Sequence, residues 1–390
     1  MWEGLFAQAL AINDFLLTLE RTELNIPIHR KNVLLGEAHG LRAFYHFDIL
    51  RLWGPYPLLI DHDDQAFMPY NDNATGGLMP LLSADSVVAK ILEDLLEAER
   101  LLQPYDPIIS QGVVKETQFD PIRDFYTNRN YRMNYYAVKA MQARVYLWIG
   151  DRPNAYAAAM EVINSPWFPW VEAATVIGGS NPDRVFSTEI IFGIHSRNMY
   201  AFYDEFFAPA LAATHELTLL QRAGANRLTQ TFDLAADIRN EPYLWKLGGG
   251  DKTYYVFYKY ARPSVRNDPN SPIKAEFFQP LIRLSEMYYI AAESAPSIRE
   301  AIELLDQVRI NRALAPFENP EAMTTAQFFA ELRKEYEKEF IGEGQLYFYY
   351  KRRFITEIPS GIAVGDVSLT QRLMIPQTEQ QARGTGGTTN

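Results

Sequence analysis

The chain has 390 residues, enough for one large domain or two of average size, and its 47% hydrophobic and 22% charged shares are those of an ordinary folded protein. A formal net charge of −11 argues against a nucleic-acid binder, which needs a basic face to neutralise phosphates. The absence of cysteine excludes disulfides, thiolate catalysis and cysteine-bearing zinc sites, while aromatic residues reach 13% of the chain.

A hydrophobic period of 3.6 residues recurs along most of the chain and predicts a mostly helical protein. One apolar stripe over 88–102 follows the cap candidate Ser83. Two more stripes, over 137–148 and 155–162, flank the short turn at 150–153, Gly-Asp-Arg-Pro. In that turn the Gly can end one helix, the Asp can cap the next, and the Pro fits its first turn. The pattern predicts an antiparallel helical hairpin.

A second hairpin is predicted over 284–291 and 301–308, with a capping-box pattern at 297–300 between its two stripes. A further helix opens with the capping-box pattern at 324–327 and stops at Gly342. Small alanines facing large aliphatic residues, in helix pairs joined by tight turns, are typical of tetratricopeptide-type packing, although no regular period of about 34 residues is visible. We therefore expect a superhelix of α-hairpins.

Two stretches depart from the helical pattern. Residues 60–80 are polar and rich in Gly and Asn, as in an exposed loop. Residues 165–280 mix Pro, Gly and Asn with many aromatic residues and contain two strand-like runs, 189–194 and 253–260. Long loops on a rigid scaffold are common places for binding residues, so this insertion is the predicted binding face.

These patterns predict a single domain over residues 1–382. It consists of an N-terminal helical part (1–164), the loop-rich insertion (165–280) and a C-terminal helical part (281–382). Residues 383–390 are rich in Gly and Thr and are expected to be disordered.

Six sequence motifs resemble those of one known family, in the same order along nearly the whole chain. The segment 36–58, GEAHGLRAFYHFDILRLWGPYPL, is similar to the hallmark helix of the SusD/RagB family of outer-membrane nutrient-binding lipoproteins of Bacteroidetes. The other segments that resemble the family are 143–151, 189–192, 283–309, 335–345 and 375–377. One departure is Tyr349-Tyr350-Lys351-Arg352, where Asp-Leu-x-Arg is frequent in the family.

The resemblance implies a SusD-like fold, a place on the outer face of the outer membrane, and a partner, the SusC-type TonB-dependent transporter. In the family the scaffold side faces the transporter and the loop-rich side receives the ligand. The family's leader and lipid-bearing cysteine are missing from this sequence, so we expect contact with the membrane only through a lipid anchor of the full-length protein. No later stretch has the roughly 18 consecutive apolar residues that spanning requires.

The ionic residues of the hallmark helix favour a structural role. Arg42, Asp48 and Arg51 stand among aromatic residues, and such groups are expected to form partly buried ion pairs and guanidinium stacks.

A second ionic stripe lies in the C-terminal helical part, where Glu335, Glu339 and Glu343 stand four residues apart on one helical face. Like charges at this spacing repel each other unless arginines form ion pairs with them, and Arg309 and Arg312 are candidate partners.

The sequence predicts no enzyme, no cofactor and no metal site. A glycosidase needs two carboxylates across a cleft, and no known catalytic or nucleotide-binding motif occurs. His39 and His46 lie two helical turns apart, on the order of 10 Å, too far to share a metal. His62, among the acids Asp61, Asp63 and Asp64, could hold a surface cation, but the calcium-loop pattern is not met.

Aromatic side chains are the remaining candidates for function, because sugar rings present apolar faces that suit a flat aromatic platform with polar neighbours. Trp245 is the first choice: it lies in a Gly-rich segment, 241–251, where a buried indole is less expected. Tyr243, Tyr200 and Tyr203 lie in the same insertion. The alternative, that these four pack the insertion onto the helices, remains open.

The other tryptophans are divided by their positions. Trp2, Trp53 and Trp148 are expected in the core, whereas Trp167 and Trp170 either cover the end of a helix or contact a ligand.

The predicted function is non-catalytic capture of an oligosaccharide or other glycan at the cell surface, followed by delivery to the SusC-type transporter. The overall negative charge mildly disfavours polyanionic ligands. Two alternatives stay open: a helical-repeat adaptor that binds a protein or peptide on its concave face, and an all-helical glycoside hydrolase.

Overall fold

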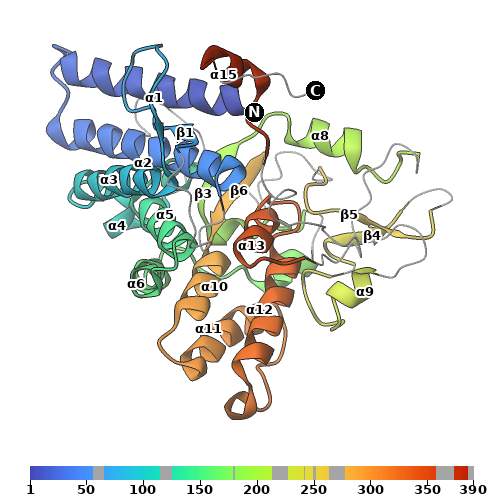
Figure 1. Cartoon of the computed structure of the whole chain (residues 1–390). Helices are drawn as coiled ribbons and strands as arrows, with labels where there is room; N and C mark the ends of the chain where they lie inside the picture. The colour runs from blue at the N-terminus through green and yellow to red at the C-terminus, as the bar shows by residue number, and fades with distance from the viewer. Residues whose placement is uncertain are drawn as a thin grey trace.

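The structure, a computed structural model, describes residues 1–55, 66–114, 125–178, 181–212, 227–240, 242–248, 252–262, 277–356 and 373–384. Figure 1 shows two groups of helices that meet at a central pair of strands, with a loop-rich region on one side. None of the described helices is both long enough and apolar enough to span a membrane.

The N-terminal group stacks helices side by side. Its members are α1 (Trp2–Arg21), α2 (Ile28–Trp53), α3 (Ala84–Leu102), α4 (Ile108–Gln111), α5 (Tyr135–Trp148) and α6 (Arg152–Ile163). The predicted hairpin is present: Gly150 has a φ of 78°, and Asp151 accepts a hydrogen bond from the Asn154 backbone N–H at 3.3 Å. Ser83 caps α3 as predicted. The tight turn sets α5 and α6 antiparallel.

The C-terminal group continues the stack, because α10 packs against α6. It consists of α10 (Leu284–Ser294), α11 (Ile298–Ile310), α12 (Thr325–Glu339), α13 (Leu346–Arg352) and α15 (Gln377–Ala382). The capping box at Thr324 and Gln327 is present, and the predicted hairpin is α10–α11. Thr378 of α15 donates a hydrogen bond to Glu3 at 3.1 Å, so the two ends of the chain lie together (Figure 1).

The described strands are short and pair in twos. They are β1 (Met68–Pro69) with β2 (Leu81–Leu82), β3 (Ile190–His195) with β6 (Phe278–Arg283), and β4 (Trp245–Leu247) with β5 (Tyr255–Phe257), each pair antiparallel. The runs predicted at 189–194 and 253–260 correspond to β3 and β5. Strand β6 lies outside both predicted runs, and its pairing with β3 joins the insertion to the C-terminal helices.

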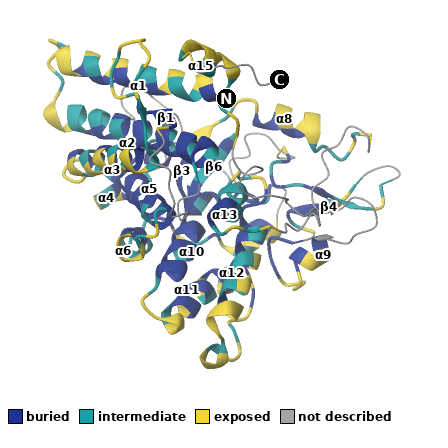
Figure 2. Ribbon diagram, in the orientation of Figure 1, coloured by how far each residue is buried: buried dark blue, intermediate teal, exposed yellow. Residues whose placement is uncertain are grey.

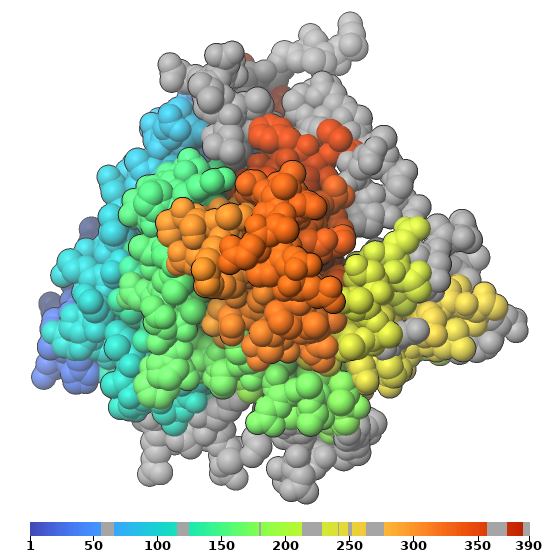
Figure 3. Space-filling view, turned by 90° about the horizontal axis from the view of Figure 1, so that it is seen from below, coloured from blue at the N-terminus to red at the C-terminus, as the bar shows by residue number. Residues whose placement is uncertain are grey.

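The remaining elements lie at the edges of these groups: α7 (Ala173–Ile177), α8 (Met199–Phe206) and α9 (Arg227–Thr231), and three single 3-10 turns at Arg129–Tyr131, Ser187–Glu189 and Pro320–Ala322. Figure 3 shows α9 and the strands β4 and β5 as a lobe beside the C-terminal helices. Figure 2 shows that the helices bury the faces they turn toward each other, whereas α8 carries much exposed surface.

The core has two main parts. The larger is formed by both helical groups and contains Trp2, Trp53 and Trp148, as predicted. The smaller lies inside the insertion and includes Phe186, Phe232 and Trp245. The fold prediction, a mostly helical stack of hairpins with a loop-rich insertion, is confirmed. The tail expected to be disordered lies outside the described residues from 385 onward.

Candidate functional site

The insertion is held on the helical scaffold by a buried ionic network centred on Glu339 of α12. One carboxylate oxygen of Glu339 lies 2.5 Å from Arg283 and 2.6 Å from Arg312, and the other lies 3.0 Å from Arg239. Burial alone would raise the pKa of Glu339, but the charges of Arg312 and Arg283 outweigh it and hold the pKa well below its usual range. These buried ion pairs connect the insertion to α12.

The network also settles the role of the glutamate stripe predicted along α12. Arg312 contacts Glu339, and Arg309 lies 3.7 Å from Glu335, as the sequence suggested. Arg239 and Arg283, which the sequence did not single out, supply the remaining partners. Arg283 lies at the end of β6, the strand that the sequence analysis missed.

The hallmark helix shows the same structural use of charge. Arg51 forms an ion pair with Asp48 and stacks on Phe348, with its guanidinium carbon 3.7 Å from the ring centroid. Arg42 binds Asp94 of α3 at 2.5 Å. Partly buried ion pairs and guanidinium stacking, expected from the sequence, are both present.

Trp245 does not lie where the sequence analysis placed it. The premise of an exposed loop indole is wrong, because Trp245 opens strand β4 and is only 1% exposed. Its strand partner in β5 is Phe257, and the two rings lie 5.2 Å apart in the smaller core. A side chain so covered cannot stack on a sugar in this conformation. The sequence signal misled because Gly-rich flanks hide a three-residue strand.

The three predicted tyrosines are also turned mainly inward. Tyr200 and Tyr203 lie on the buried face of α8, where the Tyr203 hydroxyl donates to the Phe257 backbone oxygen at 3.0 Å. Tyr243 is half-buried and packs on the same core as Trp245. The structure thus brings Trp245 and Tyr243 together in one apolar cluster, and Tyr203 is bonded to Phe257 of that cluster. Ligand contact by the three tyrosines stays a prediction.

The outer face of α8 carries the aromatic side chains that the sequence analysis overlooked. Phe202 is 53% exposed and Phe206 is 36% exposed, and their spacing of four residues places them on one side of the helix. The buried stripe of Met199, Tyr200 and Tyr203 lies directly beside them on the helix, so periodicity alone does not show which of the two stripes is exposed. Two exposed rings on one short helix form an apolar surface among the described residues.

Charged groups lie on another side of α8. Asp204 forms an exposed ion pair with Arg262 at 3.1 Å, and the Arg262 guanidinium carbon lies 5.4 Å from the Tyr200 ring centroid. Asp204 is two residues from both Phe202 and Phe206, so it lies on the opposite side of the helix from the two exposed rings. The two rings themselves form an apolar platform, which suits a ligand with an apolar face.

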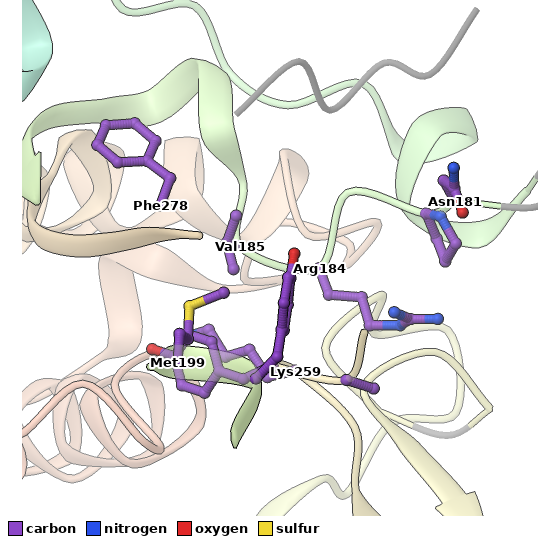
Figure 4. Close-up of a pocket in the computed structure, with 10 residues that line it drawn as sticks. Asn181, Arg184, Val185, Met199, Lys259 and Phe278 are labelled. Atoms are coloured by element: carbon purple, nitrogen blue, oxygen red, sulfur yellow. The ribbon is translucent and has the colours of Figure 1, made fainter. Parts of the chain in front are cut away.

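A small cavity lies against the inner side of α8. Figure 4 shows its lining, which includes Asn181, Arg184, Met199, Lys259 and Phe278. Its volume is about 20 Å³, room for about one water molecule and too little for a sugar ring. The cavity is therefore not the place for a whole saccharide unit.

Trp167 and Trp170 have separate environments. Trp170 is half-buried and lies 5.2 Å from the Arg312 guanidinium carbon and 5.0 Å from the Tyr288 ring, contacts that favour packing. Trp167 is also half-buried and lines a pocket of about 200 Å³ together with Asn130 and Thr188. Contact with a ligand stays a prediction for both.

No cluster of three or more His, Asp or Glu side chains suited to a metal occurs in the described ranges. The possible cation site at His62, with Asp61, Asp63 and Asp64, lies outside them. His39, considered as a metal ligand, instead bonds to Asp94 at 2.8 Å.

Comparison with known proteins identifies the architecture. The model of the SusD family matches residues 221–385. A SusD superfamily protein from Bacteroides thetaiotaomicron superposes with a TM-score of 0.69 at 19% identity, over 98% of this chain and 84% of the other. A SusD-like carbohydrate binding protein from Bacteroides vulgatus gives a TM-score of 0.71 at 17% identity, over 98% and 82%. A laminarin binding SusD-like protein gives 0.64 at 17% identity, over 98% and 83%.

A curated relative, the SusD-like protein P38 of Formosa agariphila, is 41% identical over 68 residues. That alignment spans 17% of this chain and only 12% of the relative. The fold and its aromatic insertion define a helical-hairpin protein with a loop-built face. The solved structures show that the chain has the SusD-like fold, and the family model matches its C-terminal two fifths.

Proposed function

We propose that this protein is a non-catalytic glycan-binding protein of the cell surface and that it holds an oligosaccharide against the outer face of α8. The observation that carries the proposal is the exposed pair Phe202 and Phe206 on a helix whose other face is anchored by Tyr200 and Tyr203. Relatives named for carbohydrate or laminarin binding share the fold and support this class of ligand.

Binding would rest on stacking and hydrogen bonding alone. The apolar face of a sugar ring would lie on Phe202 or Phe206, while its hydroxyls stay open to hydrogen bonds with water and neighbouring polar groups. Because the network around Glu339 holds the insertion in place, the loss of conformational entropy on ligand binding should be small. No bond in the glycan is made or broken in this scheme.

The finer part of the proposal concerns location and partner. The match of residues 221–385 to the SusD family model supports a lipid-anchored protein on the outer membrane that passes its ligand to a SusC-type TonB-dependent transporter. A co-purification test with the transporter encoded beside this gene, if there is one, addresses it: a stable complex is expected, and full separation at native expression levels counts against delivery by direct contact.

Calorimetry with a panel of neutral oligosaccharides, laminarin fragments among them, tests the binding itself. Removing both rings in Phe202→Ala/Phe206→Ala should cost about 2 kcal/mol, a more than tenfold loss of affinity. Phe15→Ala is the matched control, because Phe15 is also an exposed phenylalanine on a helix, 42% exposed on α1, and should leave affinity unchanged.

Other results would favour the alternatives. Equal saccharide affinity in the double variant and the unaltered protein would remove α8 as the site. Release of reducing sugar by the purified protein would favour a hydrolase. Saturable binding of peptides with none of any saccharide would favour an adaptor.

A further inference from the structure

Arg184 differs from the other buried arginines of the described chain. Each of the others has a carboxylate partner, and these are Arg42, Arg51, Arg129, Arg144, Arg239, Arg283, Arg309, Arg312 and Arg352. Arg184 is only 9% exposed, yet it has no ion pair, and its buried Nε has no hydrogen-bond partner among the described residues. A buried guanidinium left in this state is unfavourable unless something outside the chain binds it.

The contacts that Arg184 does make are weak substitutes for an anion. Its guanidinium carbon lies 5.5 Å from the centroid of the Tyr258 ring, a cation–π distance. Burial lowers the pKa of Arg184, and only the hydroxyls of Tyr203, Tyr258 and Tyr200 oppose that effect. No acidic side chain of the described residues is among the causes.

A second cation lies at the same ring. The Lys246 ammonium of β4 is 4.9 Å from the Tyr258 centroid, and Lys246 is half-buried with no ion pair in the described ranges. The pKa of Lys246 is lowered first by burial and then by the charge of Arg184, so the two cations are near enough to repel each other. An anion bound there would relieve both the burial and the repulsion.

The cavity beside Arg184 has room for about one water molecule, which is the size of a single oxygen atom of an oxyanion. Arg184 lines the cavity of about 20 Å³ on the inner side of α8, and Figure 4 shows Arg184 and Asn181 on the same side of it. Tyr200 of α8 lines the same cavity, and Arg262 lies over the Tyr200 ring at 5.4 Å.

We propose that Arg184 and Lys246 form a subsite for an oxyanion, a carboxylate or sulfate group carried on a sugar ring. The sugar part rests on the proposed function, whereas the anion site stands on the unpaired cations alone. The net charge of −11 does not oppose it, because at physiological salt charges beyond about 8 Å are largely screened. The local pair of cations outweighs the distant acids.

The test compares glucose, glucuronate and glucose 6-sulfate by calorimetry at one ionic strength set with NaCl. Both anions, or one of them, should bind more tightly than glucose by tenfold or more. Binding of glucuronate alone identifies a uronate subsite, and binding of the sulfate ester alone identifies a sulfated-sugar subsite. Lys246→Gln and Arg184→Gln should each remove most of the preference, whereas Lys90→Gln, a lysine of α3 paired with Asp72 at 2.9 Å, should keep it.

Thermal unfolding guards against a trivial loss of structure. Arg184→Met removes an unpaired buried charge and should leave the melting temperature unchanged or raise it, whereas Arg144→Met breaks the pair with Glu286 at 2.5 Å and should lower it.

Two outcomes would overturn the subsite: no preference for either anion over glucose, or a preference that survives in both Arg184→Gln and Lys246→Gln. Failure of the proposed function is a separate result. In that case glucuronate or the sulfate ester binds, but no oligosaccharide binds more tightly than its single ring, and the Phe202→Ala/Phe206→Ala variant changes nothing.

Discussion

The helical scaffold and the loop-rich insertion treat buried charge differently. In the scaffold, Arg144 meets Glu286 and Arg352 meets Glu293, each through two hydrogen bonds. In the insertion, Arg184 is buried to a similar degree without a carboxylate partner. A charge matched inside the chain holds the fold, whereas an unmatched one is available to a ligand.

The aromatic residues show the same division. Within the scaffold the rings pack on one another, as Tyr336 does on Tyr349 at 4.1 Å. On α8 the aromatic residues separate by face, with Tyr200 and Tyr203 inside and Phe202 and Phe206 outside. We expect ligand binding in this molecule where aromatic side chains are exposed or where buried charges lack a partner among the described residues.

The largest expected effect on stability comes from disrupting the ionic network around Glu339, which connects the insertion to the helical scaffold. Glu339→Gln removes the carboxylate shared by Arg239, Arg283 and Arg312 and leaves buried guanidinium groups without their anion. We expect a loss of about 3–5 kcal/mol in the free energy of unfolding, measured by urea denaturation.

Glu303→Gln is the control for that measurement. Glu303 forms a solvent-exposed ion pair with Arg299 at 3.0 Å, so its carboxylate should contribute little to the free energy of unfolding. Equal stability in Glu339→Gln and Glu303→Gln would mean that the junction is not held by this network.

Much of the scaffold could be predicted from sequence because its signals are local. The turn at 150–153 and the capping box at 324–327 each fix a helix end within four residues, and both are present. The insertion offers no such signals: β4 is three residues long and pairs with β5 through long-range contacts. The burial of Trp245 depends on that pairing, which no local pattern encodes.

The site followed the same rule. The sequence analysis singled out Tyr200 and Tyr203, which lie on α8, rather than the exposed rings of that helix, because phenol and indole groups are the usual choice for a sugar platform. Which ring faces out depends on the side from which the rest of the insertion packs. The partner of Arg312 could be anticipated, whereas the lack of a partner for Arg184 could not, because an absence of pairing is a property of the folded chain.

A smaller loss of stability is expected at acidic pH, and it should arise from a buried histidine of the helical scaffold. His46 of α2 is fully buried, its Nδ1 donates to the Arg42 backbone oxygen at 2.9 Å, and its Nε2 accepts from the Asn71 backbone N–H at 2.9 Å. Burial lowers the pKa of His46 from 6.5 to about 4, so the folded protein prefers the neutral ring. Stability from this group is complete above pH 6.5 and falls as the pH drops toward about 4, by about 3 kcal/mol in all.

Urea denaturation at a series of pH values tests this. His46→Gln should be less stable at neutral pH but should lose the slope between pH 6.5 and about 4, whereas His29→Gln, at an exposed position, should keep it. A slope that persists in His46→Gln would assign the acid sensitivity to another group.

The smallest expected effect on stability concerns two neighbouring residues of the 3-10 turn Ser187–Glu189, one with a partner and one without. Glu189 is paired with Arg312 at 2.7 Å, but the buried hydroxyl of its neighbour Thr188 has no hydrogen-bond partner in the described chain. Thr188→Val keeps the shape and removes the unpaired hydroxyl, so we expect a gain of about 1 kcal/mol, with Thr325→Val on the surface of α12 within about 0.5 kcal/mol of zero. A loss in Thr188→Val would instead mean that bound water or a ligand satisfies the hydroxyl from the pocket beside Trp167. That result would indicate that the Thr188 hydroxyl, like the Arg184 guanidinium, serves to bind a molecule from outside the chain rather than to stabilise the fold.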